Sequence, residues 1–316
     1  MTFPPPGAPR ARIPGPQQPP PPYPRIRAGL WRRFLGGGLA VWALTVLAAY
    51  ATADTALLPT PILLGGFLLP VVLVLWAYER HGCDLGVSAV LGCFLAGGTL
   101  GVLGASVTEN QLLGPSLRTF AAAGPVEEAV KLGALMFVLR RLPGIHGMRA
   151  GLVLGAAVGC GFAALEGSGQ AFGAALSADG PGLRTLLETE ALRGMLTPLG
   201  HGLWTAMAGG ALLAHRRPNG RFRLGSGPVL AAWLGAGLLH TLWDSTHGIA
   251  LWLVARLAGP YPARELFAQG YVPGPTAAQE HLLAVFTAAG LVLVCLLGIA
   301  RVRSLARRGA SWRNTP

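Results

Sequence analysis

The stretch GPVEEAVKLGAL, residues 124–135, places two glutamates and a lysine inside an apolar segment. It is preceded by LRTFAAA and followed by MFVLR, a composition typical of a membrane span. A charge near the bilayer centre costs roughly 2.5 to 3.5 kcal/mol even on the mild insertion scale. Residues three and four apart share a helix face, so Glu127 and Glu128 can each pair with Lys131. The stretch therefore predicts a spanning helix whose charged side chains face protein.

The composition around this stretch indicates a membrane protein. Hydrophobic residues make up 52% of the 316 residues and charged residues only 12%, and the mean hydropathy is +0.50. These values exclude an ordinary soluble domain. The net charge of +12 does not indicate a nucleic-acid partner, because 24 of the 25 basic residues are arginines scattered between apolar runs. The four cysteines form no CxxC pair, so we expect neither disulfides nor cysteine metal ligands.

Eight apolar runs have the length of about 20 residues that a helix needs to cross about 30 Å of hydrocarbon. The fold class that they predict is all-α, a polytopic bundle of about eight transmembrane helices. The runs cover residues 33–53, 58–78, 85–107, 119–139, 150–173, 193–214, 227–256 and 281–300. We expect a disordered Pro-rich tail over residues 1–29, a transmembrane domain over 30–303 and a basic tail over 304–316. The first tail is interpreted as a solvated spacer, with docking of an unidentified partner as the alternative.

The distribution of basic residues predicts the orientation. Cytoplasmic loops collect lysine and arginine. With the N-terminus inside, 19 of the 25 basic residues fall in inner segments, five in outer segments and Lys131 in the membrane. This asymmetry predicts that both termini lie in the cytoplasm, as in a multi-pass protein of the plasma membrane.

Further ionisable residues lie inside the predicted spans, away from their ends, and they include Glu166, His201, His240 and Asp244. Glu166 lies seven residues after the last glycine of a GxxxGxxxG ladder, Gly151 to Gly159, which permits close helix packing. The same helix face therefore turns Glu166 toward protein. Counting residues along each run places all the polar groups in one layer, about 12 to 14 Å below the outer surface at 1.5 Å per residue. We predict that they meet there.

Such a layer could hydrolyse a peptide bond. The reaction needs a base to activate water and groups that stabilise the oxyanion. Glu127 or Glu128 is predicted to be the base, with His201 and His240 positioning water or the oxyanion. Asp244 would orient an imidazole, and Glu166 would hold the paired glutamates or Lys131. His247, Trp204 and Trp243 are expected to be structural or packing residues.

Other functions remain open for the same residues. Clustered intramembrane carboxylates also serve proton-coupled transporters, and a noncatalytic scaffold is a third hypothesis. A zinc site on Glu128, His201 and His240 is an alternative to metal-independent chemistry. The sequence contains no HExxH motif.

Three motifs resemble those of the PrsW family of intramembrane peptidases: EEAVK (127–131), FAALE (162–166) and HTLWD (240–244). His201, in HGLWTAMAGG, also matches a helix of that family. The resemblance covers about residues 120 to 250. It implies that residues 30–303 form an intramembrane endopeptidase domain. The implied substrate is a membrane-anchored protein, and regulated proteolysis of single-span anti-sigma factors is one implied role.

The family is related to the CAAX prenyl endopeptidase and bacteriocin-processing group, whose glutamate motif usually ends in arginine where this chain has Lys131. That relationship implies a glutamate peptidase without a metal cofactor, and membrane lipid as the surrounding medium.

Overall fold

A computed structural model describes residues 29–82, 84–112, 117–175, 183–263, 266 and 269–311. Within these ranges the chain forms helices and no strands. The helices are α1 (Leu30–Thr52), α2 (Pro59–His81), α3 (Val87–Ala96), α4 (Val102–Leu112), α5 (Leu117–Leu139), α6 (Met148–Ala175), α7 (Leu183–Ala214), α8 (Gly227–Ala258) and α10 (Ala277–Ser311). A 3-10 turn, η1 (Thr55–Leu57), precedes α2, and a π-helical turn, η2 (Gly97–Gly101), joins α3 to α4. Almost all of the predicted N-terminal tail, residues 1–28, and Cys83 lie outside the described residues.

The all-helical prediction is confirmed, and each predicted run coincides with helix. The run 85–107 corresponds to α3, η2 and α4 together. Two helices are longer than their apolar runs: α7 starts at Leu183 and α10 continues to Ser311, through the first part of the predicted basic tail. Cys93, Cys160 and Cys295 are buried free thiols, as expected for small apolar residues.

Five helices are long and apolar enough to cross a membrane in the described part of the chain. They cover Leu30–Thr52, Pro59–His81, Val87–Thr108, Met148–Gly173 and Ala277–Arg307. Helices α5, α7 and α8 do not meet this criterion of length and apolar composition. They carry Glu127, Glu128, Lys131, His201, His240 and Asp244. Most of the polar site residues thus lie on the three long helices that do not meet the criterion for a membrane span.

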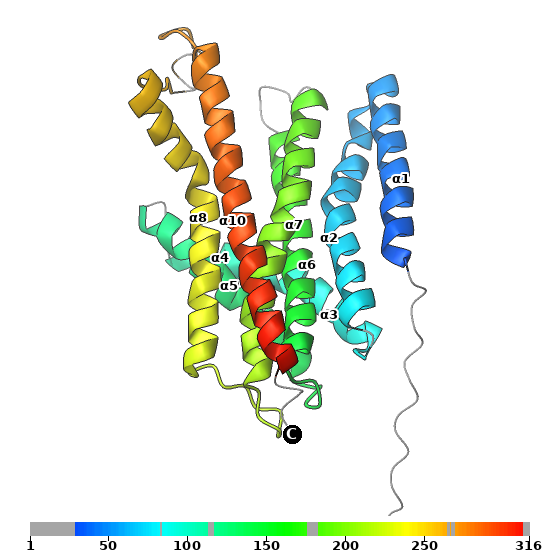
Figure 1. Ribbon diagram of the computed structural model, residues 1–316. Coiled ribbons are helices and arrows are strands. Elements are labelled where there is room, and N and C mark those ends of the chain that lie inside the picture. The colour runs from blue at the N-terminus through cyan, green and yellow to red at the C-terminus, as the bar shows by residue number, and fades with distance from the viewer. Residues whose placement is uncertain are drawn as a thin grey trace, which may run out of the picture.

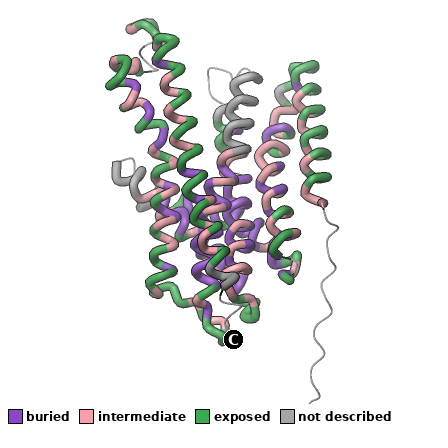
Figure 2. Tube along the Cα trace, in the orientation of Figure 1, coloured by how far each residue is buried: buried purple, intermediate pink, exposed green. Residues whose placement is uncertain are grey.

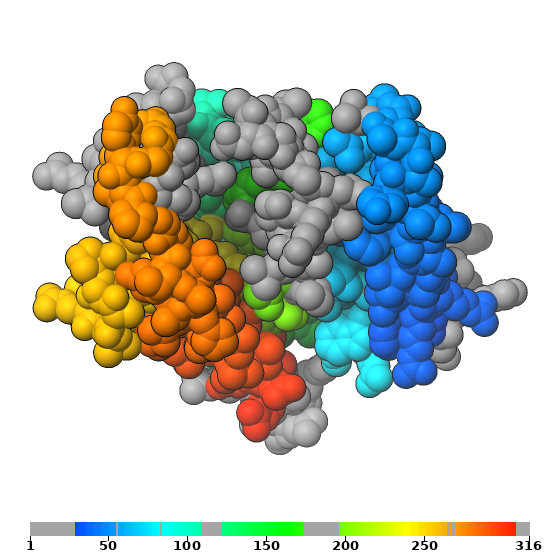
Figure 3. Space-filling view, turned by 90° about the horizontal axis from the view of Figure 1, so that it is seen from above, coloured from blue at the N-terminus to red at the C-terminus, as the bar shows by residue number. Residues whose placement is uncertain are grey.

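The helices form a bundle with α6 and α7 at its centre (Figure 1). Helix α1 lies at one edge beside α2, and α8 and α10 lie at the opposite edge, as the view from above also shows (Figure 3). Buried residues gather in the central helices, while α1 and α10 are largely exposed (Figure 2). The exposed faces of these outer helices are apolar, as expected for surfaces in contact with lipid.

Glycines set the distance between α6 and α7. A Cβ added at Gly159, Gly155 or Gly151 would fall on the backbone of α7, against His201, Thr205 and Gly209 respectively. The predicted GxxxGxxxG ladder is therefore a contact between two backbones. It places His201 of α7 directly beside the face of α6 that carries Glu166.

Two more close contacts fix the neighbouring helices. In η2, a Cβ at Gly98 would lie 2.9 Å from the carbonyl oxygen of Gly161, and one at Gly101 would lie 2.9 Å from the Phe162 ring. Helices α5 and α8 cross where a Cβ at Gly124 would lie 2.7 Å from the carbonyl oxygen of Gly237. Gly124 and Gly237 each precede a site residue by three positions, Glu127 and His240 respectively. This crossing therefore brings those two side chains face to face.

Candidate active site within the bundle

Lys131 of α5 is the centre of a buried polar cluster. Its ammonium nitrogen lies 2.8 Å from Glu128 Oε1, 3.2 Å from Glu127 Oε2 and 2.8 Å from His201 Nδ1. The same nitrogen lies 3.8 Å from the centre of the Phe162 ring. The residue is fully buried. An ammonium group has three N–H donors, so the three polar contacts use all of them.

The two adjacent glutamates face different helices, because successive residues point about 100° apart around a helix. Glu128 is completely buried; its Oε2 accepts a hydrogen bond of 3.0 Å from Thr205 Oγ1 of α7. Glu127 lies toward α8, with its Oε2 3.6 Å from His240 Nε2. Its side chain keeps 11% exposure, whereas that of Glu128 has none. Glu128 is thus enclosed by protein, and Glu127 borders open space.

His201 joins α5, α6 and α7. Its Nδ1 faces Lys131, and its Nε2 lies 3.1 Å from Glu166 Oε2. The other oxygen of Glu166 accepts a 2.9 Å hydrogen bond from Gln170. The Glu166 side chain is 23% exposed, so it forms the accessible edge of the cluster.

His240 of α8 closes the cluster on the other side. Its Nε2 lies 3.6 Å from Asp244 Oδ2, and its Nδ1 lies 3.3 Å from Glu128 Oε1. The second pair is not aligned for a hydrogen bond, so Nδ1 is a buried nitrogen without a hydrogen-bond partner in the described part of the chain. Asp244 is the most open of these carboxylates, with a side chain that is 33% exposed.

Two tryptophans pack against the histidines. The Trp204 ring stacks on His240 with centroids 4.7 Å apart and meets His201 edge to face at 5.2 Å. Trp243 contacts Trp204 in turn at 5.8 Å. The sequence predicted a packing role for both residues, and Trp204 packs within the cluster itself. Trp204 follows His201 by three residues, and Trp243 follows His240 by three, so each pair shares a helix face. This spacing was the signal that could have placed Trp204 in the cluster.

Residues 84–268 match the sequence profile of a family described as PrsW family intramembrane metalloprotease. The match covers more than half of the 316 residues and runs through all the helices that build the cluster. The chain belongs to the PrsW family. It is accordingly an intramembrane protease, a hydrolase that acts on membrane-anchored proteins. No curated protein and no solved structure matches the chain.

Membership of the PrsW family favours a peptidase over the transporter and the scaffold considered from sequence. It also favours a metal ion in the site, because the family is described as one of metalloproteases. This description does not support the metal-independent glutamate enzyme that the sequence favoured.

The residues of this PrsW protein fit a metal ion. Glu127, His201 and His240 each offer one ligand atom, the atoms lie within 4.8 Å of one another, and all three residues are buried. Two imidazoles and a carboxylate are a ligand set of catalytic zinc. The sequence-based alternative named Glu128 in place of Glu127. The structure groups Glu127, not Glu128, with the two histidines.

All seven residues singled out from sequence lie in this cluster: Glu127, Glu128, Lys131, Glu166, His201, His240 and Asp244. Thr205, Trp204 and the ring of Phe162 complete it. The predicted convergence of these helices on one layer is therefore observed, while the roles of the individual residues are proposals.

Proposed function

We propose that the protein is an intramembrane endopeptidase in which Glu127, His201 and His240 hold a zinc ion and Glu166 is the general base. The observation that carries this proposal is the convergence of three buried ligand atoms within 4.8 Å. A partly exposed carboxylate, Glu166, stands 3.1 Å from one of the three residues. A bound zinc ion activates water toward attack and polarises a carbonyl group.

Glu128 and Lys131 hold the ligands in place. Histidines that bind metal usually have a carboxylate beside their second nitrogen, which fixes the ring. Glu128 Oε1, 3.3 Å from His240 Nδ1, stands in that relation. The ammonium of Lys131 balances the glutamate pair, which would otherwise be an uncompensated buried charge.

Glu166 takes the proton of the attacking water. Of the two predicted bases, Glu128 is fully engaged by Lys131 and Thr205, and Glu127 serves as a ligand. Glu166 is more exposed than either. It can return the proton to the leaving amine, since a general base acts as the acid in the reverse proton transfer. Asp244 orients His240.

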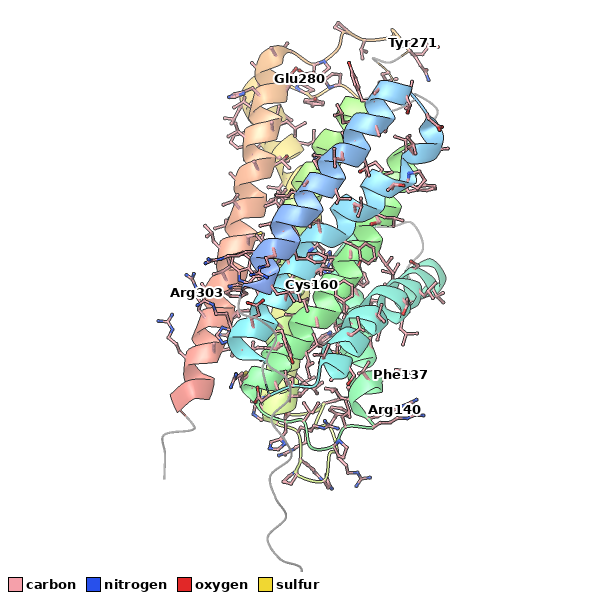
Figure 4. The ribbon with its side chains drawn as sticks, turned by 90° about the vertical axis from the view of Figure 1, so that its right-hand side faces the viewer. Phe137, Arg140, Cys160, Tyr271, Glu280 and Arg303 are labelled. Atoms are coloured by element: carbon pink, nitrogen blue, oxygen red, sulfur yellow. The ribbon has the colours of Figure 1, made fainter. Side chains whose placement is uncertain are left out.

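We further propose eight spans with both termini in the cytoplasm of a plasma-membrane protein. In Figure 1, α1 runs upward from its start and α10 runs downward to its end, so the start of α1 and the end of α10 both point toward the lower end of the bundle. In Figure 4, Arg140 lies toward that end and Tyr271 and Glu280 lie toward the opposite one, with Arg303 between them. Glu166 follows Cys160 by six residues, about 9 Å farther from the arginine-rich end at 1.5 Å per residue. Glu166 stands 18 residues after the start of α6 at Met148 and nine before its end at Ala175, which supports cleavage toward the extracytoplasmic end of a substrate span. Single-span anti-sigma factors are the substrate class that the family resemblance suggests.

Purified protein and a single-span substrate test this function. Glu166→Gln keeps the shape and removes the base, so kcat should fall by about 10² or more, while the zinc content stays unchanged. Glu127→Gln should lose both zinc and activity, and a chelator should inactivate the parent protein reversibly. Glu280→Gln, at the far end of α10, is the matched control and should cleave normally. Mass spectrometry of the new substrate N-terminus should place the cut toward the extracytoplasmic side.

Full activity of Glu166→Gln would remove the base assignment. Full activity of chelated protein that contains no metal would remove the zinc and restore the metal-independent hypothesis.

A further inference from the structure

A cavity distinct from the catalytic cluster opens at the arginine-rich end of the bundle. Its volume is about 950 Å³, and it lies between α7, α8 and α10, with the start of α6 and the residues after α2 at its mouth. None of the residues assigned to catalysis or metal binding lines it. The family match assigns no role to this cavity.

The mouth of the cavity is polar and cationic. It is lined by Arg149, Arg301, Asp84 and three histidines, His81, His146 and His215. Asp84 lies 3.5 Å from Arg149 and offsets part of its charge. No ion pair of Arg301 is found with any residue that the structure describes. The guanidinium of Arg301 is therefore available to an anion.

The rest of the wall is apolar and open to the side. Leu238 of α8 and Leu297 of α10 line it, and they are 60% and 47% exposed. From Pro228 to Leu239, both in the lining, the cavity follows α8 over eleven residues. This is about 16 Å at 1.5 Å per residue, close to half of the about 30 Å hydrocarbon core. The cavity thus has the depth of one leaflet.

We propose that this cavity binds an anionic phospholipid from the leaflet on the arginine-rich side. The phosphate group lies against Arg301 and Arg149, and an acyl chain follows α8 past Gly235 toward Leu239. A soluble anion would satisfy the mouth and leave the apolar wall uncovered. A peptide segment would have to bury its backbone polar groups against leucine and alanine side chains, at considerable cost. A lipid matches both parts of the cavity.

The charge requirement is tested with delipidated full-length protein and three probes: phosphatidylglycerol, phosphatidylcholine with the same chains, and glycerol phosphate without chains. Native mass spectrometry measures the bound lipid. Phosphatidylglycerol should bind most tightly, and Arg301→Gln should weaken it about fivefold, from roughly 1 kcal/mol per basic residue near anionic lipid. Arg303→Gln removes the same charge from the same helix outside the cavity, so it should bind like the parent protein.

The acyl-chain requirement has its own variant. A Cβ at Gly235 meets no atom within 4 Å, so Gly235→Leu fills the cavity without displacing protein. It should reduce lipid binding at least fivefold and leave the thermal midpoint near that of the parent. Gly37→Leu on α1, where a Cβ also meets nothing within 4 Å, is the control.

Three results would each overturn the proposal. They are equal binding of phosphatidylglycerol and phosphatidylcholine, equal binding of glycerol phosphate, and unchanged lipid binding in Arg301→Gln or Gly235→Leu.

Discussion

Lys131 is a cation that contacts two of the three proposed zinc ligands. Its ammonium donates to Glu127 Oε2 at 3.2 Å and faces His201 Nδ1 at 2.8 Å. A metal ion on those residues and the ammonium of Lys131 therefore share acceptors. Removing one member of a buried charged group typically costs about 3 to 5 kcal/mol, because the remaining charges lose their partner. A metal ion could replace the missing positive charge, which makes the stability of a Lys131 variant informative.

We predict that Lys131→Met makes folding dependent on metal. In chelator, the variant should unfold at a much lower temperature than the parent, because Glu127 and Glu128 are left without a cation. Added zinc should raise its thermal midpoint by more than that of the parent. Arg216→Met, which removes a buried arginine that donates to backbone carbonyls in the loops, is the control. It should be destabilised without any added response to zinc. Equal zinc responses of Lys131→Met and the parent would contradict shared acceptors.

Sequence spacing predicted which polar residues gather but not their partners. Glu127 and Glu128 stand four and three residues before Lys131, and both spacings permit an ion pair. The two glutamates differ in their contacts with other helices. Glu128 contacts Thr205, and Glu127 lies near His240. Spacing within one helix carries no information about such contacts. The packing role of Trp204 was predicted, but its two histidine partners were not, because these contacts depend on how α7 meets α8.

At the scale of helices, the glycine ladder of α6 controls the position of His201. A Cβ at Gly159 would meet the backbone carbonyl of His201, which cannot rotate away as a side chain could. The GxxxGxxxG pattern was visible in the sequence and its packing role is confirmed. The π-helical turn η2 was not predicted, because the apolar pattern continues through GGTLG without a break.

We predict that Gly159→Ala separates α6 from α7 and impairs catalysis. Overpacking typically costs 1 to 3 kcal/mol, and a displacement of about 1 Å at a catalytic group can cost about 10² in rate. The variant should lower kcat/KM at least tenfold and lower the thermal midpoint. Gly169→Ala on the same helix, where a Cβ meets nothing within 4 Å, should change neither. Parent-like kcat/KM in Gly159→Ala would show that this contact does not position His201.

At the scale of the whole molecule, the helices were predictable from the length of the apolar runs, and five of them in the described part of the chain are long and apolar enough to cross a membrane. The arrangement of the helices was not predictable, since apolar surfaces pack in many ways with similar energy. The structure places α6 and α7 at the centre and α1 at the edge (Figure 1). Arg140 lies toward one end of the bundle and Tyr271 and Glu280 toward the other, with Arg303 between them (Figure 4).

The difference in basic residues between the two ends of the bundle predicts its orientation in the membrane. Basic residues are retained on the cytoplasmic side during insertion, so the end of the bundle that bears Arg140 should face the cytoplasm. A reporter fused after Arg217, in the loop between α7 and α8, and one fused after Pro316 should both signal from the cytoplasm. A reporter after Gly274, between α8 and α10, should signal from outside. A cytoplasmic signal after Gly274 would invert the bundle and move the proposed cleavage side with it.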